Sequence, residues 1–314
     1  MQLNDRIGRR IKLQDLHVFM TVVEAGSMGK AAQRLNTSQP NISRSIADLE
    51  SAMGVRLLDR HRQGIEPTEY GRALLESGVA ALDDLRQGVK KIEFLADPEA
   101  GEVRIGSSFF LAASFVSAVI DRVSLRYPRI VFHLVATPTE TMHRELSERN
   151  VDFLITQKFG PVADERLSFE FLFDDSYVVV AGAQNPWVRR RRIDLAELTN
   201  ESWLLPPPES VFGSLFREAF RAKGLDYPRT TVFTLPRDVR ISLLATGRFL
   251  TIFPTYVLKF PLGHSELKAL PVELPISPLP HGIFTLKDRT LSPSARLFIE
   301  TARAVAKPLA KRKP

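Results

Sequence analysis

The sequence predicts an α/β protein with an all-α N-terminal part. Three observations in its 314 residues lead to this fold class. Short stretches with helical apolar spacing fill the first sixty residues, one long apolar stripe follows, and strand patterns alternate with helix patterns from residue 102 onward. The domains expected from these changes are a start of short helices with a small two-stranded ribbon at residues 1–70, a linker helix at 71–97 and an α/β domain at 98–314. The ribbon is expected at 55–68, where apolar and charged residues alternate around Gly64.

Two glycines and two serines mark the ends of the expected N-terminal helices. Gly26 follows the first helical pattern and Gly54 the third, and glycine is favoured where a helix stops. Ser27 and Ser38 precede the second and third patterns, in the place of capping residues. The second and third helices then have the proportions of a helix-turn-helix, which projects polar side chains into the DNA major groove. A plain helical hairpin inside a bundle has the same pattern, so spacing alone leaves both interpretations open.

The expected third helix carries side chains suited to reading DNA. Arg44 can reach a guanine edge or a phosphate, and Gln39 or Asn41 can make paired hydrogen bonds to adenine. The formal charge of +7 agrees with a polyanionic partner without identifying one.

Composition and motifs exclude several other classes. The chain has no cysteine, which excludes disulfides, thiolate metal sites and a cysteine nucleophile. It lacks the glycine-rich, nucleophile-elbow and zinc-protease motifs, and its six histidines do not stand at metal-ligand spacing. We therefore expect no enzyme activity, catalytic residue, metal or cofactor. No window reaches the ~18 apolar residues of a membrane span, and no signal peptide pattern is present, so we expect a cytoplasmic protein without membrane contact.

The wording of the N-terminal segment is more specific than its spacing. The run "AAQRLNTSQPNISRSIADLESAMGVRLLDR" at residues 31–60 is similar to the winged helix-turn-helix of the LysR-type transcriptional regulators. The resemblance continues through the linker helix and the alternating domain, so it covers nearly the whole chain. It implies a transcriptional regulator that binds promoter DNA as a homo-oligomer and responds to a small-molecule effector. RNA polymerase is a further partner that it implies.

The resemblance assigns DNA contacts to the recognition helix and the wing. The residues concerned are Ser38, Gln39, Pro40, Asn41, Ser43 and Arg44 on the helix and Arg60 and Arg62 on the wing. Ser38 and Pro40 also have a simpler interpretation as a helix cap and a helix starter. Gly29, His61 and Pro67 depart from the family pattern, which leaves the phosphate contacts of the second helix and the wing open.

The apolar stripe of the linker helix indicates self-association. A solitary helix of this length must bury its stripe on a partner, and two-fold pairing matches an operator with two half-sites. The family usually forms tetramers, and the sequence does not separate a dimer from a tetramer. The residues assigned to dimerisation are Leu75, Val79, Leu82 and Val89.

By the same resemblance, the last domain is a two-lobed module like the periplasmic binding proteins. Lobe I is expected at 102–174 and 280–306, and lobe II at 175–279. Ligands of such folds sit at the carboxyl ends of the strands, between the lobes. The candidate effector-binding residues are Ser107, Ser108, Thr139, Gln157, Ser210 and Phe212. Hydroxyl residues after strands are also common helix caps, so each candidate has that second interpretation.

Two stretches of the last domain carry a hint about the ligand. "WLLPPPESVFGSLFREAFRAKGL" and "LLATGRFLTIFP" look like the subgroup that regulates sugar-uptake or aromatic-acid genes, so a sugar or an aromatic acid is expected as effector. The alternative to the whole assignment is a solute-binding or enzymatic α/β protein whose N-terminal helices serve assembly only. The run Arg189–Arg192 and the basic C-terminal tail are explained by neither hypothesis.

Overall fold

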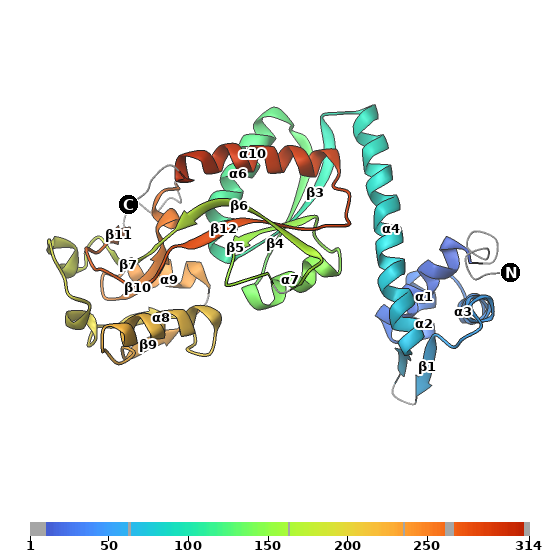
Figure 1. Ribbon diagram of the computed structural model, residues 1–314, viewed down its shortest axis with the longest axis horizontal. Helices are drawn as coiled ribbons and strands as arrows, with labels where there is room; N and C mark the ends of the chain where they lie inside the picture. Colours follow the sequence, from blue (N-terminus) through green and yellow to red (C-terminus); the bar gives the residue numbers. More distant parts are fainter. Residues whose placement is uncertain (1–10, 62–63, 163, 235, 261–266, 311–314) are drawn as a thin grey trace. The chain divides into compact units, whose positions relative to one another are not determined.

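The computed structural model describes residues 11–61, 64–162, 164–234, 236–260 and 267–310 (Figure 1). The chain divides into two compact units, Met1–Val89 and Lys90–Pro314, and each is described by itself.

Three helices and a two-stranded ribbon open the first unit. They are α1 (Leu13–Ala25), α2 (Met28–Arg34), α3 (Gln39–Met53), β1 (Leu58–His61) and β2 (Gly64–Pro67). Gly26 and Gly54 end α1 and α3 in the left-handed conformation, with φ of 64° and 75°, as the sequence predicts. Asn36 turns the chain between α2 and α3 with φ of 48°, a region that asparagine tolerates better than most residues.

Hydrogen bonds from backbone amides fix the ribbon to the helices. Ile65 N donates to the carbonyl of Gly26 over 3.0 Å, which joins β2 to the turn after α1. Glu50 Oε1, on α3, accepts from the amides of Leu57 at 2.7 Å and Leu58 at 3.2 Å. The ribbon therefore has a defined position beside α3, as a wing does.

Two glycines let the helix α4 (Glu69–Ala96) approach this core closely. A Cβ built on Gly71 would lie 2.1 Å from the carbonyl oxygen of Leu57, and one on Gly78 would lie 2.8 Å from Leu16 Cδ1. The first part of α4 thus packs on α1 and on the chain leading into the ribbon.

The second unit consists of two five-stranded sheets, which we call lobe I and lobe II. Lobe I has the strand order β4-β3-β5-β12-β6, and lobe II has the order β11-β7-β10-β8-β9. The strands of lobe I are β3 (Ala100–Ser107), β4 (Arg129–Ala136), β5 (Phe153–Gln157), β6 (Leu167–Asp175) and β12 (Leu279–Leu286). Those of lobe II are β7 (Tyr177–Gly182), β8 (Trp203–Leu205), β9 (Thr230–Phe233), β10 (Leu250–Pro254) and β11 (Leu267–Ala269).

Helices cover both faces of each sheet. In lobe I, alternate residues of β5 point to opposite faces: Phe153 and Ile155 join the cluster that includes α10, and Leu154 joins the cluster that includes α7. The helices of lobe I are α5 (Phe109–Leu111), the π-helical turn η2 (Ala112–Val116), α6 (Ser117–Arg126), α7 (Thr139–Ser147) and α10 (Pro293–Ala310). Those of lobe II are η3 (Pro186–Arg189), η4 (Leu195–Leu198), α8 (Val211–Ala222), α9 (Arg237–Leu244) and η5 (Thr255–Leu258).

The sheets are mixed, whereas the alternating pattern predicts a parallel sheet. In lobe I, β3 is parallel to β4 and β5, but β12 pairs antiparallel with both β5 and β6. The strand β6 continues directly into β7 of lobe II, and β12 brings the chain back, so these two strands join the lobes and run in opposite directions. The helix–strand alternation describes the parallel strands, which are β3–β5 of lobe I and β8–β10 of lobe II. It does not describe the antiparallel strands at which the chain crosses between the lobes.

A buried carboxylate holds the crossing in place. Asp175 is the last residue of β6, and its carboxylate accepts hydrogen bonds from Thr255 Oγ1 and, over 3.1 Å, from Tyr256 N. Lys259 Nζ lies 3.6 Å from the same carboxylate. These contacts tie the end of β6 to η5 of lobe II. Burial raises the pKa of Asp175, and the hydrogen bonds and Lys259 oppose that rise.

Across the described ranges, the helices are all too short or too polar to traverse a lipid bilayer.

Candidate functional site

The N-terminal half of α3 presents a polar, exposed surface. Its inward residues Ile42, Ile46 and Leu49 are buried in the core of the first unit, which orients the opposite face outward. Five of the six predicted helix contacts are exposed and Ser43 is half-buried; the exposed ones are Ser38, Gln39, Pro40, Asn41 and Arg44. The structure therefore brings the predicted recognition residues together on one face of one helix.

The cap position of α3 retains a free hydroxyl within the part of the chain that the structure describes. Ser38 is the N-cap, with extended backbone, and Pro40 lies in the first turn, but the Ser38 side chain makes no cap hydrogen bond. Asn41 Nδ2 donates to Thr37 Oγ1 over 3.2 Å, which orients the amide beside the turn. A free hydroxyl at a helix N-terminus suits a phosphate oxygen.

The wing carries one of its two predicted contacts within the described residues. Arg60 is exposed on β1, opposite Ile65 of β2. Arg62 lies outside the described residues. His61 is the last residue of β1 and Pro67 is the last residue of β2. The paired ribbon therefore accommodates both of these departures from the family pattern.

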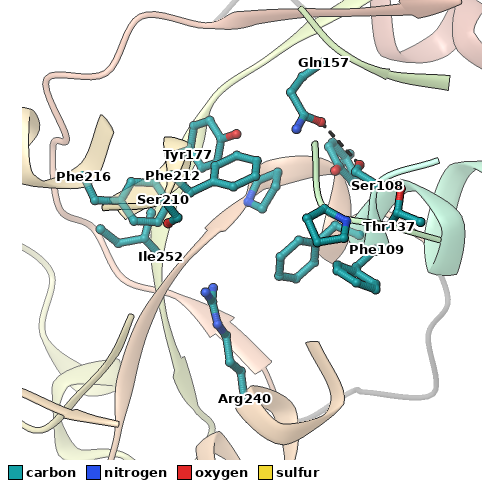
Figure 2. Close-up of a pocket in the computed structure, with 14 residues that line it drawn as sticks. Ser108, Phe109, Thr137, Gln157, Tyr177, Ser210, Phe212, Phe216, Arg240 and Ile252 are labelled. Carbon is teal, nitrogen blue, oxygen red and sulfur yellow. Dashed lines mark hydrogen bonds between the residues drawn. The ribbon is translucent and has the colours of Figure 1, made fainter. Parts of the chain in front are cut away.

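The second unit contains a cavity between its lobes (Figure 2). Lobe I contributes the segments that follow β3 and β4 and the end of β5, and lobe II contributes the N-terminal turn of α8, residues of β7 and β10, and Arg240 of α9. The lining residues are Ser108, Phe109, Phe110, Thr137, Pro138, Gln157, Tyr177, Ser210, Phe212, Phe216, Arg240, Ile252, Pro254 and Tyr256. The walls are mostly aromatic and aliphatic with a few polar groups, as in most small-molecule sites.

Four of the predicted effector residues line this cavity. Ser108 Oγ donates to Gln157 Oε1 over 3.3 Å, so these two form one polar group on the wall of lobe I. Ser210 caps α8 by accepting from Gly213 N over 3.1 Å, and Phe212 packs its ring against Phe159 at 5.5 Å between centroids. Ser210 therefore fulfils its capping role and still faces the cavity.

The other two predicted residues are placed differently. Ser107 is fully buried, its Oγ donates to the Ile155 carbonyl over 2.8 Å, and it does not belong to the lining. Successive side chains along an extended chain point in opposite directions. The Ser107 hydroxyl therefore points into the sheet, and the side chain of the next residue, Ser108, reaches the cavity. Thr139 begins α7, and its side chain lies outside what the structure describes. Thr137 and Pro138 line the cavity from that loop.

Sequence patterns do not reveal Arg240, the charged residue of the lining. It is 3% exposed, and its Nε and Nη2 both donate to the Thr234 carbonyl, over 3.1 and 2.9 Å. Burial lowers the pKa of Arg240 to about 10, which leaves the guanidinium charged at neutral pH. Its apolar neighbours on the helix are a sequence feature that could indicate burial, but an arginine on a helix is ordinarily a surface residue.

The strand that returns to lobe I carries a buried histidine beside the cavity wall. His281 is 1% exposed, with its ring stacked on Phe173 at 5.1 Å and edge-on to Tyr256, a lining residue. Nδ1 donates to the Leu279 carbonyl over 2.9 Å, and burial lowers the pKa of His281 to about 4. His281 is therefore neutral in the folded protein at neutral pH.

We expect His281 to make the folded state less stable as the pH falls. The unfolded chain takes up a proton on this ring below about pH 6.5, whereas the folded protein resists until about pH 4, so stability is lost through that window. Between pH 7 and pH 5 the loss from this residue is about 2 kcal/mol. Urea unfolding of wild type and His281→Gln at pH 7 and pH 5 measures this loss as the change in the stability difference between the two proteins. Asp175 is present in both proteins, so its own pH dependence cancels in that difference. An unchanged difference between the two proteins at pH 7 and pH 5 would contradict the assignment.

No group of three histidine or acidic side chains within the described ranges could hold a metal ion.

A helix-turn-helix with a wing, a long helix and a two-lobed module with an internal cavity together define a ligand-responsive DNA-binding regulator. The chain belongs to the LysR family of transcriptional regulators. Residues 13–72 match the family model described as "Bacterial regulatory helix-turn-helix protein, lysR family", and residues 96–307 match "LysR substrate binding domain".

Curated relatives and solved structures agree along nearly the full length. GbpR of Azospirillum brasilense, an HTH-type transcriptional regulator, is 26% identical over 298 residues, which cover 95% of this chain and 87% of the relative. PcaQ of Agrobacterium fabrum, also an HTH-type transcriptional regulator, is 24% identical and covers 96% of both chains. Full-length OxyR of Pseudomonas aeruginosa has the same fold, with a TM-score of 0.68 at 19% identity over 97% of this chain and 99% of that one.

These relatives are transcriptional regulators and not enzymes, which agrees with the expectation from the motifs. The alternative of a solute-binding or enzymatic protein with helices for assembly only finds no support among them.

Proposed function

We propose that this LysR-type regulator binds promoter DNA as a homo-oligomer and alters that binding when a small effector occupies the cavity between the lobes. The observation that carries the proposal is the exposed polar half of α3, which is held outward by a buried apolar face on the same helix. In this assignment Gln39, Asn41 and Arg44 contact base edges, and Ser38 and Arg60 contact phosphates. Arg62, Ser43 and Pro40 complete the surface that the family resemblance implies.

The distal part of α4 is proposed as the self-association surface. Val89 is 53% exposed, and Leu85 and Ile92 on the same stripe are 51% and 68% exposed. Leu75, Val79 and Leu82 are half-buried and continue the stripe toward the N-terminal end of α4. An exposed apolar stripe of this length on a helix favours pairing with a second copy, as a dimer or as part of a tetramer. The proposed domains are 1–70 for DNA binding, 71–97 for linking and dimerisation, and 98–314 for effector binding.

The cavity is proposed as the effector site, with Ser108, Gln157, Ser210 and Phe212 as direct contacts. An effector that fits one arrangement of the lobes better than another would shift the oligomer between arrangements with different operator contacts. A sugar or an aromatic acid is the ligand class proposed from the resemblance, with Thr139, the first residue of α7, as a further candidate contact. A cytoplasmic location and RNA polymerase as a partner belong to the same proposal, because promoter DNA is its target.

Arg44→Ala is expected to weaken binding to the protein's own promoter region by about 10- to 100-fold, because a bidentate arginine contact to a base contributes about 1–3 kcal/mol. A mobility shift with full-length protein measures the change. Arg221→Ala is the matched control, since it removes an exposed arginine from α8 in the effector domain. If Arg44→Ala and Gln39→Ala both bind as tightly as this control, the recognition assignment for α3 is wrong.

A further inference from the structure

The guanidinium of Arg240 is a buried positive charge on the cavity wall without a carboxylate partner among the described residues. It is 3% exposed, and the hydrogen bonds of its Nε and Nη2 go to one neutral acceptor, the Thr234 carbonyl. A guanidinium has five N–H donors in a planar fork, so one carbonyl leaves donor capacity unused. Figure 2 shows the group pointing from α9 toward the other lining residues.

The surroundings of this charge are aromatic. Its Cζ lies 5.8 Å from the ring centroids of both Phe110, of lobe I, and Phe253, of lobe II. Cation–π contacts of this kind compensate only a part of the lost hydration of a buried charge. The lowered pKa of Arg240 has the same cause, since desolvation disfavours the charged form. An anion in the cavity would restore the missing compensation, because attraction between opposite charges is strong in such an environment.

A second polar group in the cavity also lacks a partner within the described structure. Thr137 Oγ1 is buried, is without a hydrogen-bond partner and belongs to the lining from the side of lobe I. Buried polar atoms in native proteins are nearly always paired, so an unpaired one on a residue that lines a cavity indicates a group that pairs when the cavity is filled. Arg240 belongs to lobe II and Thr137 to lobe I, so the two observations are independent of each other.

The remaining lining residues indicate what kind of molecule would carry the anionic group. Six of the fourteen lining residues are aromatic: Phe109, Phe110, Tyr177, Phe212, Phe216 and Tyr256. Among the described lining residues Arg240 is the only one that carries a charge at neutral pH. The cavity thus offers one cationic point, a few neutral hydrogen-bonding groups and a large apolar area. A free inorganic anion would satisfy the charge and leave the apolar area unused, and a neutral sugar would leave the charge uncompensated.

We propose that the effector is a small organic carboxylate with an apolar body, bound with its carboxylate on Arg240 and its body among the aromatic rings. This inference rests on the proposed effector function of the cavity and narrows its ligand class to an acid. Arginine binds carboxylates through paired, charge-assisted hydrogen bonds, and the donors that Thr234 leaves unused are available for them. Thr137 supplies a further hydrogen bond to a polar group of the ligand.

The test compares acids with their own uncharged amides on full-length protein. The probes are benzoate, phenylacetate, 4-hydroxybenzoate and pentanoate, each paired with its primary amide, together with D-glucose, D-galactose and sodium sulfate at matched ionic strength. Calorimetric titration and thermal unfolding report binding. We expect at least one carboxylate to bind about 10- to 100-fold more tightly than its amide, as removal of a charge-assisted hydrogen bond implies. The sugars and sulfate are expected to bind more weakly than that acid.

Variants assign the preference to Arg240. Arg240→Gln is expected to reduce the acid-to-amide ratio to nearly one, and Arg217→Gln, which removes an exposed arginine of α8, is expected to keep the wild-type ratio. Should Arg240→Gln not fold, Arg240→Lys retains a positive charge and is expected to keep a preference for the acid. The inference is overturned if acids and amides bind wild type alike, if no carboxylate binds, if sulfate or a sugar binds best, or if Arg240→Gln keeps the acid preference.

One further variant separates this inference from the proposed function. Phe212→Ala is expected to weaken acid and amide together, because the ring contacts the body of either ligand. If ligands bind without acid preference but depend on Phe212, the effector cavity stands and only the role of Arg240 fails. If acids bind and Phe212→Ala has no effect, the cavity itself is not the effector site. Operator binding by ligand-free wild type, measured in parallel, reports on the regulator function independently of both.

Discussion

Val89→Asp is expected to convert the oligomer to monomers and to weaken binding to a two-half-site operator by about 100-fold or more, since the second half-site then no longer adds to affinity. Val89 is 53% exposed in the single chain, so aspartate there costs the fold little. In a paired interface the same carboxylate would be buried among apolar side chains without a partner, which costs several kcal/mol. Sedimentation velocity measures the oligomeric state, and a mobility shift measures the affinity.

Ala73→Asp is the matched control for this prediction. Ala73 is exposed on α4, and at 100° per residue it lies on the side of the helix away from the stripe that contains Leu82 and Val89. The Ala73→Asp variant introduces the same charge on the same helix, and we expect it to leave the oligomer intact. An unchanged oligomer for both variants would show that α4 does not carry the interface.

Asp152→Asn is expected to lower the stability of the second unit by about 3 kcal/mol. The Asp152 carboxylate is buried, accepts from Arg104 N at 2.9 Å and lies 3.2 Å from Arg289 Nη2, and Lys90 Nζ is 3.9 Å away. Arg289 is buried as well and donates to the Val151 carbonyl. Removal of one charge from such a pair leaves the other buried without compensation, which typically costs 3–5 kcal/mol. Thermal unfolding should show a melting temperature lower by roughly 6–12 °C.

Glu170→Gln provides the comparison. Glu170 pairs with Arg303 through two short hydrogen bonds of 2.6 and 2.8 Å, but both side chains are more than 40% exposed. Exposed ion pairs contribute about 1 kcal/mol or less, even with good geometry, because water solvates the separated charges. If the two variants lose equal stability, burial is not what makes the Asp152 pair important.

Local signals in the sequence predict the first unit well because its turns depend on single residues. Gly26, Asn36 and Gly54 adopt the left-handed backbone that their side chains permit, and Ser38 and Pro40 begin α3 where a cap and a first-turn proline are favoured. The alternating pattern likewise locates most helices and strands of the second unit, but it misses β6 and β11. The family resemblance, carried by about thirty consecutive residues, then supplies a function that no single signal defines.

Features that depend on distant parts of the chain escape such signals. The antiparallel insertion of β12 into lobe I follows from the return of the chain out of lobe II. Ser107 and Ser108 are adjacent hydroxyl residues, and only the orientation of β3 decides that Ser108 reaches the cavity and Ser107 bonds to Ile155. Arg240 is buried where the rings of Phe110, of the other lobe, and Phe253 both lie beside its guanidinium. Neither local periodicity nor residue type contains this information.

On the side of lobe I, the cavity is built from places where strands stop. Ser108 follows β3, Thr137 follows β4 and Gln157 ends β5, and in lobe II Pro254 ends β10. None of these four residues belongs to an apolar core, whereas Tyr177, Phe216, Ile252 and Tyr256 of lobe II do. Substitutions at such end positions change what the cavity accepts with little cost to folding, because they leave the packing of the sheets untouched. The scaffold is therefore well suited to laboratory evolution: a library confined to these few positions should yield sensors for new compounds that retain the original operator.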